Sequence, residues 1–189
     1  MRKLSAWLCI MGGLLWGLKP VYDWLILGRR INTGYNPSDI TDYIKFIFPL
    51  LCLGGVFVLF SIYKKRVRNA AIILVVAILL NSLFHFFEIY YTDSSIPFGL
   101  LFMFSGIIFL LIGGIVLAFQ LKGDKSTSRP LLFCAEALIV NTLLILILPF
   151  VSGSLPDVIL TPIMVGLMML VGFIWAAIGA VLIHDEMIT

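Results

Sequence analysis

The chain has 189 residues, of which 61% are hydrophobic and only 12% are charged, and its net charge is +3. A soluble domain carries roughly twice that charged fraction, so the composition excludes an ordinary water-soluble fold. The apolar residues form long continuous runs. In hydrocarbon only helices and closed barrels pair every backbone amide, and these runs are too long and unalternating for barrel strands. The sequence therefore predicts helices that cross a lipid bilayer.

We predict an all-α, polytopic integral membrane protein in which residues 1–189 form a single transmembrane domain. The first apolar run follows Arg2 and Lys3, as in a signal peptide. It lacks a cleavage pattern and continues past Pro20, so we expect it to be retained as the first span. Pro49 predicts a kink in the second span. Turn-forming or charged segments separate six predicted spans, at about residues 4–27, 43–63, 69–90, 97–121, 130–151 and 157–183.

A glycine-containing segment recurs late in the second, fourth and sixth spans, which suggests three helical hairpins related by a weak internal repeat. Within the fourth and sixth spans, glycines seven residues apart lie on one helix face. Small residues on a face allow two helix backbones to approach closely, which is a main source of helix association in lipid. We therefore expect the even-numbered spans to form an inner, tightly packed set. The packing residues would be Gly54, Gly55, Gly106, Gly113, Gly114, Gly172 and Gly179.

Lysine and arginine residues predict the orientation of the chain. The N-terminus and the segments after the second and fourth spans carry nine of them, whereas the opposite side carries three, Arg29, Arg30 and Lys45. Because basic residues concentrate on the cytoplasmic side, both termini are predicted to be cytoplasmic, in the inner or plasma membrane of the cell. The basic run at residues 64–68 is explained by topology and anionic lipid, without nucleic acid as a partner.

Ionisable residues inside predicted spans are the clearest sign of a functional site, because such groups are costly in lipid unless they are paired or hydrated. In the first span Lys19 and Asp23 share a helix face, and in the third span Asn81, His85 and Glu88 share another, both in the outer half. We expect a common cluster. Three interpretations remain open for it, namely mutual neutralisation, a ligand or ion pocket, and a metal or catalytic site built on the His85–Glu88 spacing.

Two further polar positions lie in the fifth span. Glu136 is in its inner half, seven residues after Arg129, and is either paired with that arginine or a proton-coupled carboxylate. Asn141 faces another direction and is expected to be an interhelical hydrogen bonder. The three cysteines lie inside apolar runs without metal-ligand spacing, so no metal site and no cofactor are predicted.

These features favour a small multi-pass protein that is not an enzyme. It would act as a transporter-like or ligand-binding component, or as an accessory subunit that has the lipid bilayer and other membrane subunits as partners. The sequence contains no phosphate-binding loop, G-x-S-x-G or H-E-x-x-H motif, and its predicted loops are too short for a catalytic domain. The alternatives are an intramembrane enzyme that uses His85 and Glu88 on a lipid or peptide, and a purely structural or immunity-type membrane protein.

Overall fold

The long apolar runs of the sequence form helices in the computed structural model, which describes residues 1–25, 40–90, 96–122, 128–151 and 156–188. No strand occurs in these ranges, as expected for backbone that must pair its own amides in lipid. The elements in chain order are α1 (Arg2–Leu25), α2 (Ile40–Ile44), α3 (Ile47–Leu51), α4 (Leu53–Tyr63), the 3-10 turn η1 (Lys64–Val67), α5 (Arg68–Tyr90), α6 (Ile96–Lys122), α7 (Arg129–Val151) and α8 (Asp157–Ile188).

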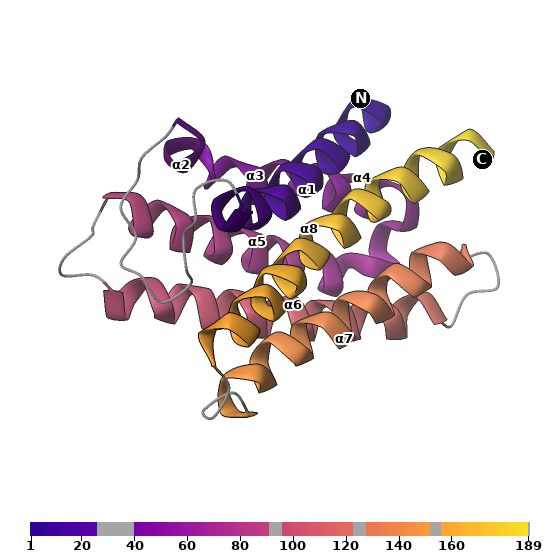
Figure 1. Ribbon diagram of the computed structural model, residues 1–189. Coiled ribbons are helices and arrows are strands. Elements are labelled where there is room, and N and C mark those ends of the chain that lie inside the picture. Colours follow the sequence, from indigo (N-terminus) through magenta and orange to yellow (C-terminus); the bar gives the residue numbers. More distant parts are fainter. Residues whose placement is uncertain (26–39, 91–95, 123–127, 152–155, 189) are drawn as a thin grey trace.

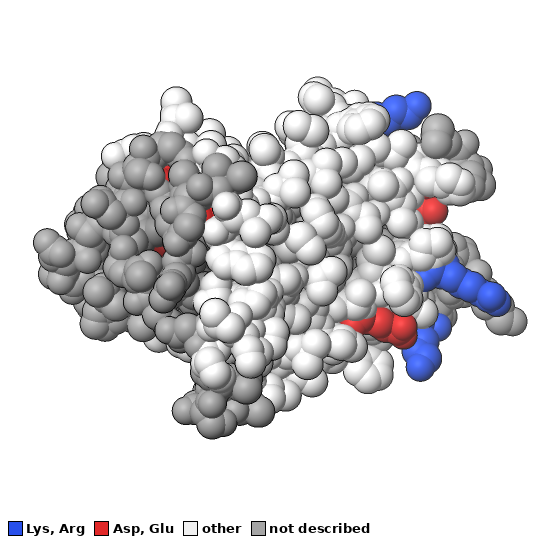
Figure 2. Space-filling model, viewed as in Figure 1, with Lys and Arg blue, Asp and Glu red and all other residues white. Residues whose placement is uncertain are grey.

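Five helical stretches of the described chain are long and apolar enough to cross a membrane. The shortest of them has 22 residues, which at 1.5 Å per residue matches the roughly 30 Å of a hydrocarbon layer. Figure 2 shows a surface that is uncharged over most of its length, with basic atoms gathered at one end. The predicted all-helical fold is therefore confirmed for the described residues, and five of its helical stretches have the length and composition of membrane spans. The stretches are Arg2–Leu25, Ile47–Glu88, Leu101–Lys122, Arg129–Phe150 and Val158–Asp185.

The stretch Ile47–Glu88 covers most of the predicted second and third spans, at 43–63 and 69–90, and the chain turns between them at η1. Lys64 begins this turn with φ 49 and ψ −129, and it is the one non-glycine residue of the described chain with a positive φ. On either side of the turn α4 and α5 contact each other. The two termini of the chain lie at the same end of the bundle (Figure 1), which we call the termini end.

The predicted second span is interrupted on both sides of Pro49. Proline has no N–H to donate to the carbonyl of Lys45, and its ring crowds that carbonyl. Phe48 N donates to Lys45 O instead, at 3.2 Å, and Cys52 N donates to Pro49 O at 2.9 Å. These tighter bonds divide the segment into α2, α3 and α4. Next to the first break, Ser82 Oγ of α5 donates to Phe46 O at 2.5 Å.

Two helix pairs form most of the bundle. The first helix packs along α8, and α5 packs along α6, while α7 lies between α6 and α8 (Figure 1). Helix α4 contacts α1, α5 and α8 and so joins the two pairs. The core between them consists of fully buried aliphatic side chains together with the indole of Trp175.

Glycines allow the closest of these contacts. A Cβ on Gly13 would lie 2.5 Å from Ala176 N, and a Cβ on Gly172 would collide with the backbone of Gly17, so α1 and α8 touch backbone to backbone. The spacing of Gly13 and Gly17 is the small-xxx-small pattern that promotes such packing. A Cβ on Gly179 would meet Ala6 O of α1 at 2.8 Å.

The other predicted packing glycines also face odd-numbered spans. The nearest neighbours of Gly54 and Gly55 are in α1, those of Gly106 and Gly113 are in α5, and that of Gly114 is Ile139 of α7. This differs from the expected inner set of even-numbered spans. Each even-numbered span uses its glycines to approach an odd-numbered one.

Candidate functional site

Lys19 is buried on α1 between two carboxylates. Its Nζ donates to Asp42 Oδ1 at 2.7 Å and also to Asp23, one turn further along α1. The side chain of Lys19 is 8% exposed and that of Asp42 is fully buried. An ammonium group at this depth requires such partners, because its desolvation alone costs several kcal/mol. The contact fixes α2 against the C-terminal half of α1.

A second buried lysine makes the equivalent contact with α5. Lys45, in the turn between α2 and α3, donates from Nζ to Glu88 Oε2 at 2.6 Å, and its side chain is 6% exposed. His85 lies one turn before Glu88, with its Nδ1 3.4 Å from the same carboxylate oxygen. Glu88 is therefore held from two directions. Together we call Lys19, Asp23, Asp42, Lys45, His85 and Glu88 the charge network.

The charge network joins three segments that are distant in sequence, α1, the α2–α3 region and the end of α5. Next to its members on α5, aromatic rings pack against rings of other segments. Phe86 lies edge-on to Phe46 at a centroid distance of 5.8 Å, and Phe87 stacks on Phe102 of α6 at 5.2 Å. Rings of this kind keep the local dielectric constant low, which strengthens each ion pair and raises the cost of an unpaired charge.

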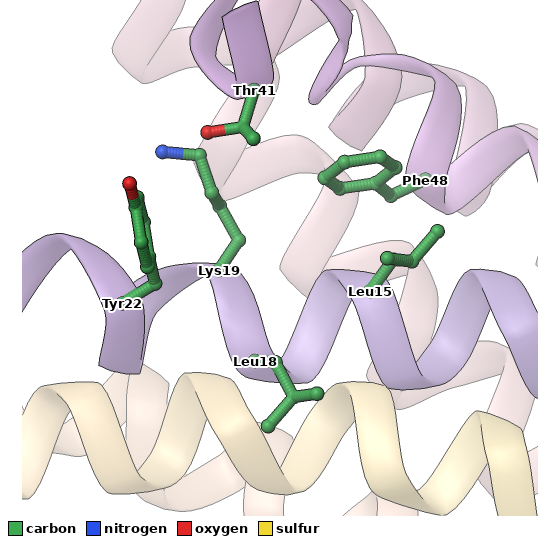
Figure 3. Close-up of a pocket in the computed structure, with 6 residues that line it drawn as sticks. All are labelled: Leu15, Leu18, Lys19, Tyr22, Thr41 and Phe48. Atoms are coloured by element: carbon green, nitrogen blue, oxygen red, sulfur yellow. The ribbon is translucent and has the colours of Figure 1, made fainter. Parts of the chain in front are cut away.

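A small cavity opens beside Lys19, between α1 and the α2–α3 region. Its volume is about 160 Å³, and its lining is mostly apolar. Figure 3 shows the Lys19 ammonium and the Tyr22 hydroxyl near Thr41 at one end, with Leu15 and Phe48 at the other. The lining surface is thus almost entirely apolar, and the volume is below the roughly 300–1,000 Å³ that is usual for small-molecule sites.

The structure places the five predicted pocket residues in different settings. Lys19 and Asp23 contact each other, as do His85 and Glu88. The first pair is bonded to Asp42 and the second to Lys45, three residues further along the chain. Asn81 lies elsewhere on α5. Its Nδ2 donates to Ala77 O at 2.9 Å, and a Cβ on Gly106 of α6 would lie 2.5 Å from that nitrogen.

Asp42 and Lys45 were not among the predicted site residues, although they complete both halves of the network. The sequence pattern that could have identified them is two charged residues, three positions apart, at the start of the second apolar run. This start is predicted to lie on the same side of the membrane as Lys19 and Asp23. From the sequence, Lys45 is predicted only to mark the side of the membrane on which its segment lies. Predicting the contact required knowing that Pro49 interrupts the helix and turns Lys45 inward.

The polar residues of α7 are separate from the network. Glu136 is exposed on the outer surface, and no ion pair among the described residues includes it. Asn141 is buried and donates from Nδ2 to Leu167 O of α8 at 2.9 Å, whereas its Oδ1 has no hydrogen-bond partner among the described residues. Asn141 is thus an interhelical hydrogen bonder. The arginine that precedes Glu136 by two turns is exposed as well.

Within the described ranges, no group of three or more His, Cys, Asp and Glu residues has the geometry to hold a metal ion. Cys9, Cys52 and Cys134 are buried and unbridged. Compared with known protein families, with curated proteins and with solved structures, the chain shows no match.

Proposed function

We propose that this chain is a six-span, multi-pass protein of the cell membrane, with cytoplasmic termini, that acts as a ligand-binding or transporter-like component or as an accessory subunit, and not as an enzyme. The charge network would be its ligand or ion site. The observation that carries the proposal is a group of six ionisable residues, of which Lys19, Asp42 and Lys45 are buried and the other three are partly buried, next to an interrupted membrane helix.

The number of ionisable groups in the network favours a ligand or ion site over a purely structural contact between helices. One ion pair is enough to hold two helices in register, and each further buried ion adds a desolvation cost of several kcal/mol. Ionisable residues within membrane spans usually mark substrate or ion pathways for that reason. Lys19, Asp23 and Glu88 all lie within the stretches that can cross the membrane.

The interruption of the second span supports the same proposal. Irregular backbone at membrane depth is tolerated where it is buried in protein or lines a water-filled cavity, and transporters commonly build their binding sites at broken helices. The break at Lys45 and Phe46 lies against Ser82 and Glu88 of α5. A ligand that entered the cavity beside Lys19 would reach the network from the side of α1.

The network suggests how a ligand would be exchanged. Lys19 occupies the position of a bound cation, since its Nζ is shared by Asp23 and Asp42. An incoming cation or amine would take over these carboxylates, and the flexible lysine chain would move aside into the cavity that it lines. Binding would thereby loosen the contact between α1 and α2.

A structural or immunity-type role is the second candidate, and the mutual pairing within the network favours it. Each lysine of the network contacts at least one carboxylate at 2.7 Å or less, so the groups stabilise one another without a ligand. Under this alternative the network only fixes the helices in place, and its removal would reduce folding and function together.

Single neutral substitutions distinguish the two candidates. We would replace Asp23 by Asn and His85 and Glu88 by Gln, and measure folded yield in detergent together with the phenotype that separates the intact gene from its deletion. The proposed site predicts near-normal yield with lost phenotype in at least one variant. Parallel loss of yield and phenotype in all three supports the structural role, and no change in either contradicts the site. His184→Gln, at an exposed histidine, is the matched control.

A further inference from the structure

The outer surface of α7 combines a carboxylate with large apolar side chains. Glu136 is flanked along the helix by Phe133, which is 70% exposed, and Val140, which is 58% exposed. Leu144 and Ile147 continue this exposed row, which we call the α7 face. Figure 2 shows acidic atoms over α7, with uncharged surface on one side of them and Lys or Arg atoms of the termini end on the other.

The position of Glu136 makes its exposure costly. It lies seven residues after Arg129, which is roughly 10 Å along the helix axis from the start of α7. Lysine and arginine have long apolar stems that carry their charge back to the headgroup layer, but a glutamate side chain is shorter and reaches less far. A carboxylate at this depth on a lipid-facing surface therefore needs a cation or hydrogen-bond donor beside it.

The described part of the chain does not supply that cation. Arg129 is exposed on the same side of α7, yet no ion pair joins it to Glu136. A second copy of the chain is a poor occupant of the α7 face. A two-fold interface between parallel copies of α7 would place the two Glu136 carboxylates near each other, and like charges repel.

We propose that the α7 face is the docking surface for a membrane helix of a different protein, which carries a lysine or arginine at the depth of Glu136. The exposed residues recur at the three- and four-residue spacing of a helix–helix seam. Phe133 and Val140 would pack against the partner helix and exclude lipid around the ion pair. This inference uses no residue of the charge network, so it stands independently of the proposed ligand site.

The test uses synthetic membrane helices as the partner. The full-length protein, with a photo-crosslinking amino acid in place of Leu144, is reconstituted in phosphatidylcholine vesicles. Two leucine-rich 24-residue peptides are added, one with a single lysine two turns from one end and one with leucine there. We expect the lysine peptide to crosslink at roughly tenfold lower concentration than the leucine peptide. Equal crosslinking of both peptides would overturn the proposal.

Two variants show whether the carboxylate is responsible. Glu136→Gln should abolish the preference for the lysine peptide while the protein remains monodisperse, because the residue is exposed. Adding Ile115→Glu to that variant restores a carboxylate on α6, also seven residues from the end of its helix, and should not restore crosslinking at position 144.

Two other outcomes are informative. A preference for the lysine peptide that appears only after Arg129→Gln would mean that Arg129 already neutralises Glu136. Crosslinked homodimers without peptide would identify a second copy as the occupant. Either result contradicts the proposal.

Discussion

At the scale of single residues, two buried lysines each form an ion pair with a carboxylate from another segment, and these pairs connect α1, the α2–α3 region and α5. Lys45 contacts Glu88 at 2.6 Å and Lys19 contacts Asp42 at 2.7 Å. Removing one partner of such a pair leaves an uncompensated charge in a low-dielectric setting, which typically costs about 3–5 kcal/mol. Reversing both charges keeps one lysine and one carboxylate at the contact.

Exchanging the charges of the second pair tests this dependence. Lys45→Glu and Glu88→Lys should each lower the free energy of unfolding in detergent by about 3 kcal/mol or more, because each places like charges side by side. The double exchange should recover more than half of that loss, as measured by thermal or detergent-titrated unfolding. Lys64→Glu, an exposed control, should change stability by about 0.5 kcal/mol or less. A double variant as unstable as the sum of the single variants would show that the pair contributes little.

Sequence alone could predict which residues of α1 and α5 carry buried charge, but not all of their partners. Periodicity places Lys19 with Asp23 and His85 with Glu88 on shared faces, because a regular helix relates positions three and four apart. Asp42 and Lys45 lie in a segment where proline breaks the helix, so helical periodicity no longer predicts which way their side chains point. Contacts between helices also depend on how the bundle packs, which no local pattern contains.

At the scale of helices, α1 and α8 touch backbone to backbone along their seam. Gly13, Gly17 and Gly172 allow the two backbones to touch, and a methyl group on Gly172 would enter the space occupied by the backbone of Gly17. Backbone atoms cannot move aside as a flexible side chain can. The two helices must therefore separate if the glycine is replaced.

Replacement of Gly172 by alanine should destabilise the bundle by about 1–3 kcal/mol, the usual cost of overpacking. The same substitution at Gly166 provides the control, since a Cβ there would meet no atom within 4 Å. Because alanine favours helix more than glycine does, Gly166→Ala should leave stability unchanged or raise it by up to about 1 kcal/mol. Thermal unfolding of both variants in the same detergent measures the difference. Equal effects would mean that the seam tolerates an added methyl group.

The glycine pattern predicted that backbones approach closely but not which helices meet. Gly172 and Gly179 share a face of α8, and that face contacts α1. The corresponding feature of α1, the spacing of Gly13 and Gly17, is equally visible in the sequence. An internal repeat shows only that segments resemble one another in sequence, whereas which helices pack together depends on whether their surfaces are complementary. For the glycine face of α8, the partner helix is the one that carries a second glycine face, α1.

At the scale of the whole molecule, the two ends of the bundle carry charge in different ways. At the termini end the basic side chains of η1 are exposed, and Arg66 Nε donates to Gln120 O at the end of α6, at 3.0 Å. Toward the other end Lys19 and Lys45 are buried within the charge network. Exposed lysine and arginine residues next to membrane spans favour the cytoplasmic side, where anionic lipid and the insertion machinery select for them.

This asymmetry predicts that both termini and η1 face the cytoplasm and that residues 94 and 154 face the opposite side. Single cysteines at Lys64, Ser94 and Ser154, together with small tags at residues 1 and 189, would be probed in intact cells with a membrane-impermeant maleimide and with antibody. Positions 94 and 154 should react in intact cells, whereas position 64 and both tags should react only after permeabilisation. If residue 154 shared the side of η1, the stretches Arg129–Phe150 and Val158–Asp185 would not both cross the membrane. An even number of crossings requires the two tags to respond alike, and tags on opposite sides would contradict the six-span arrangement.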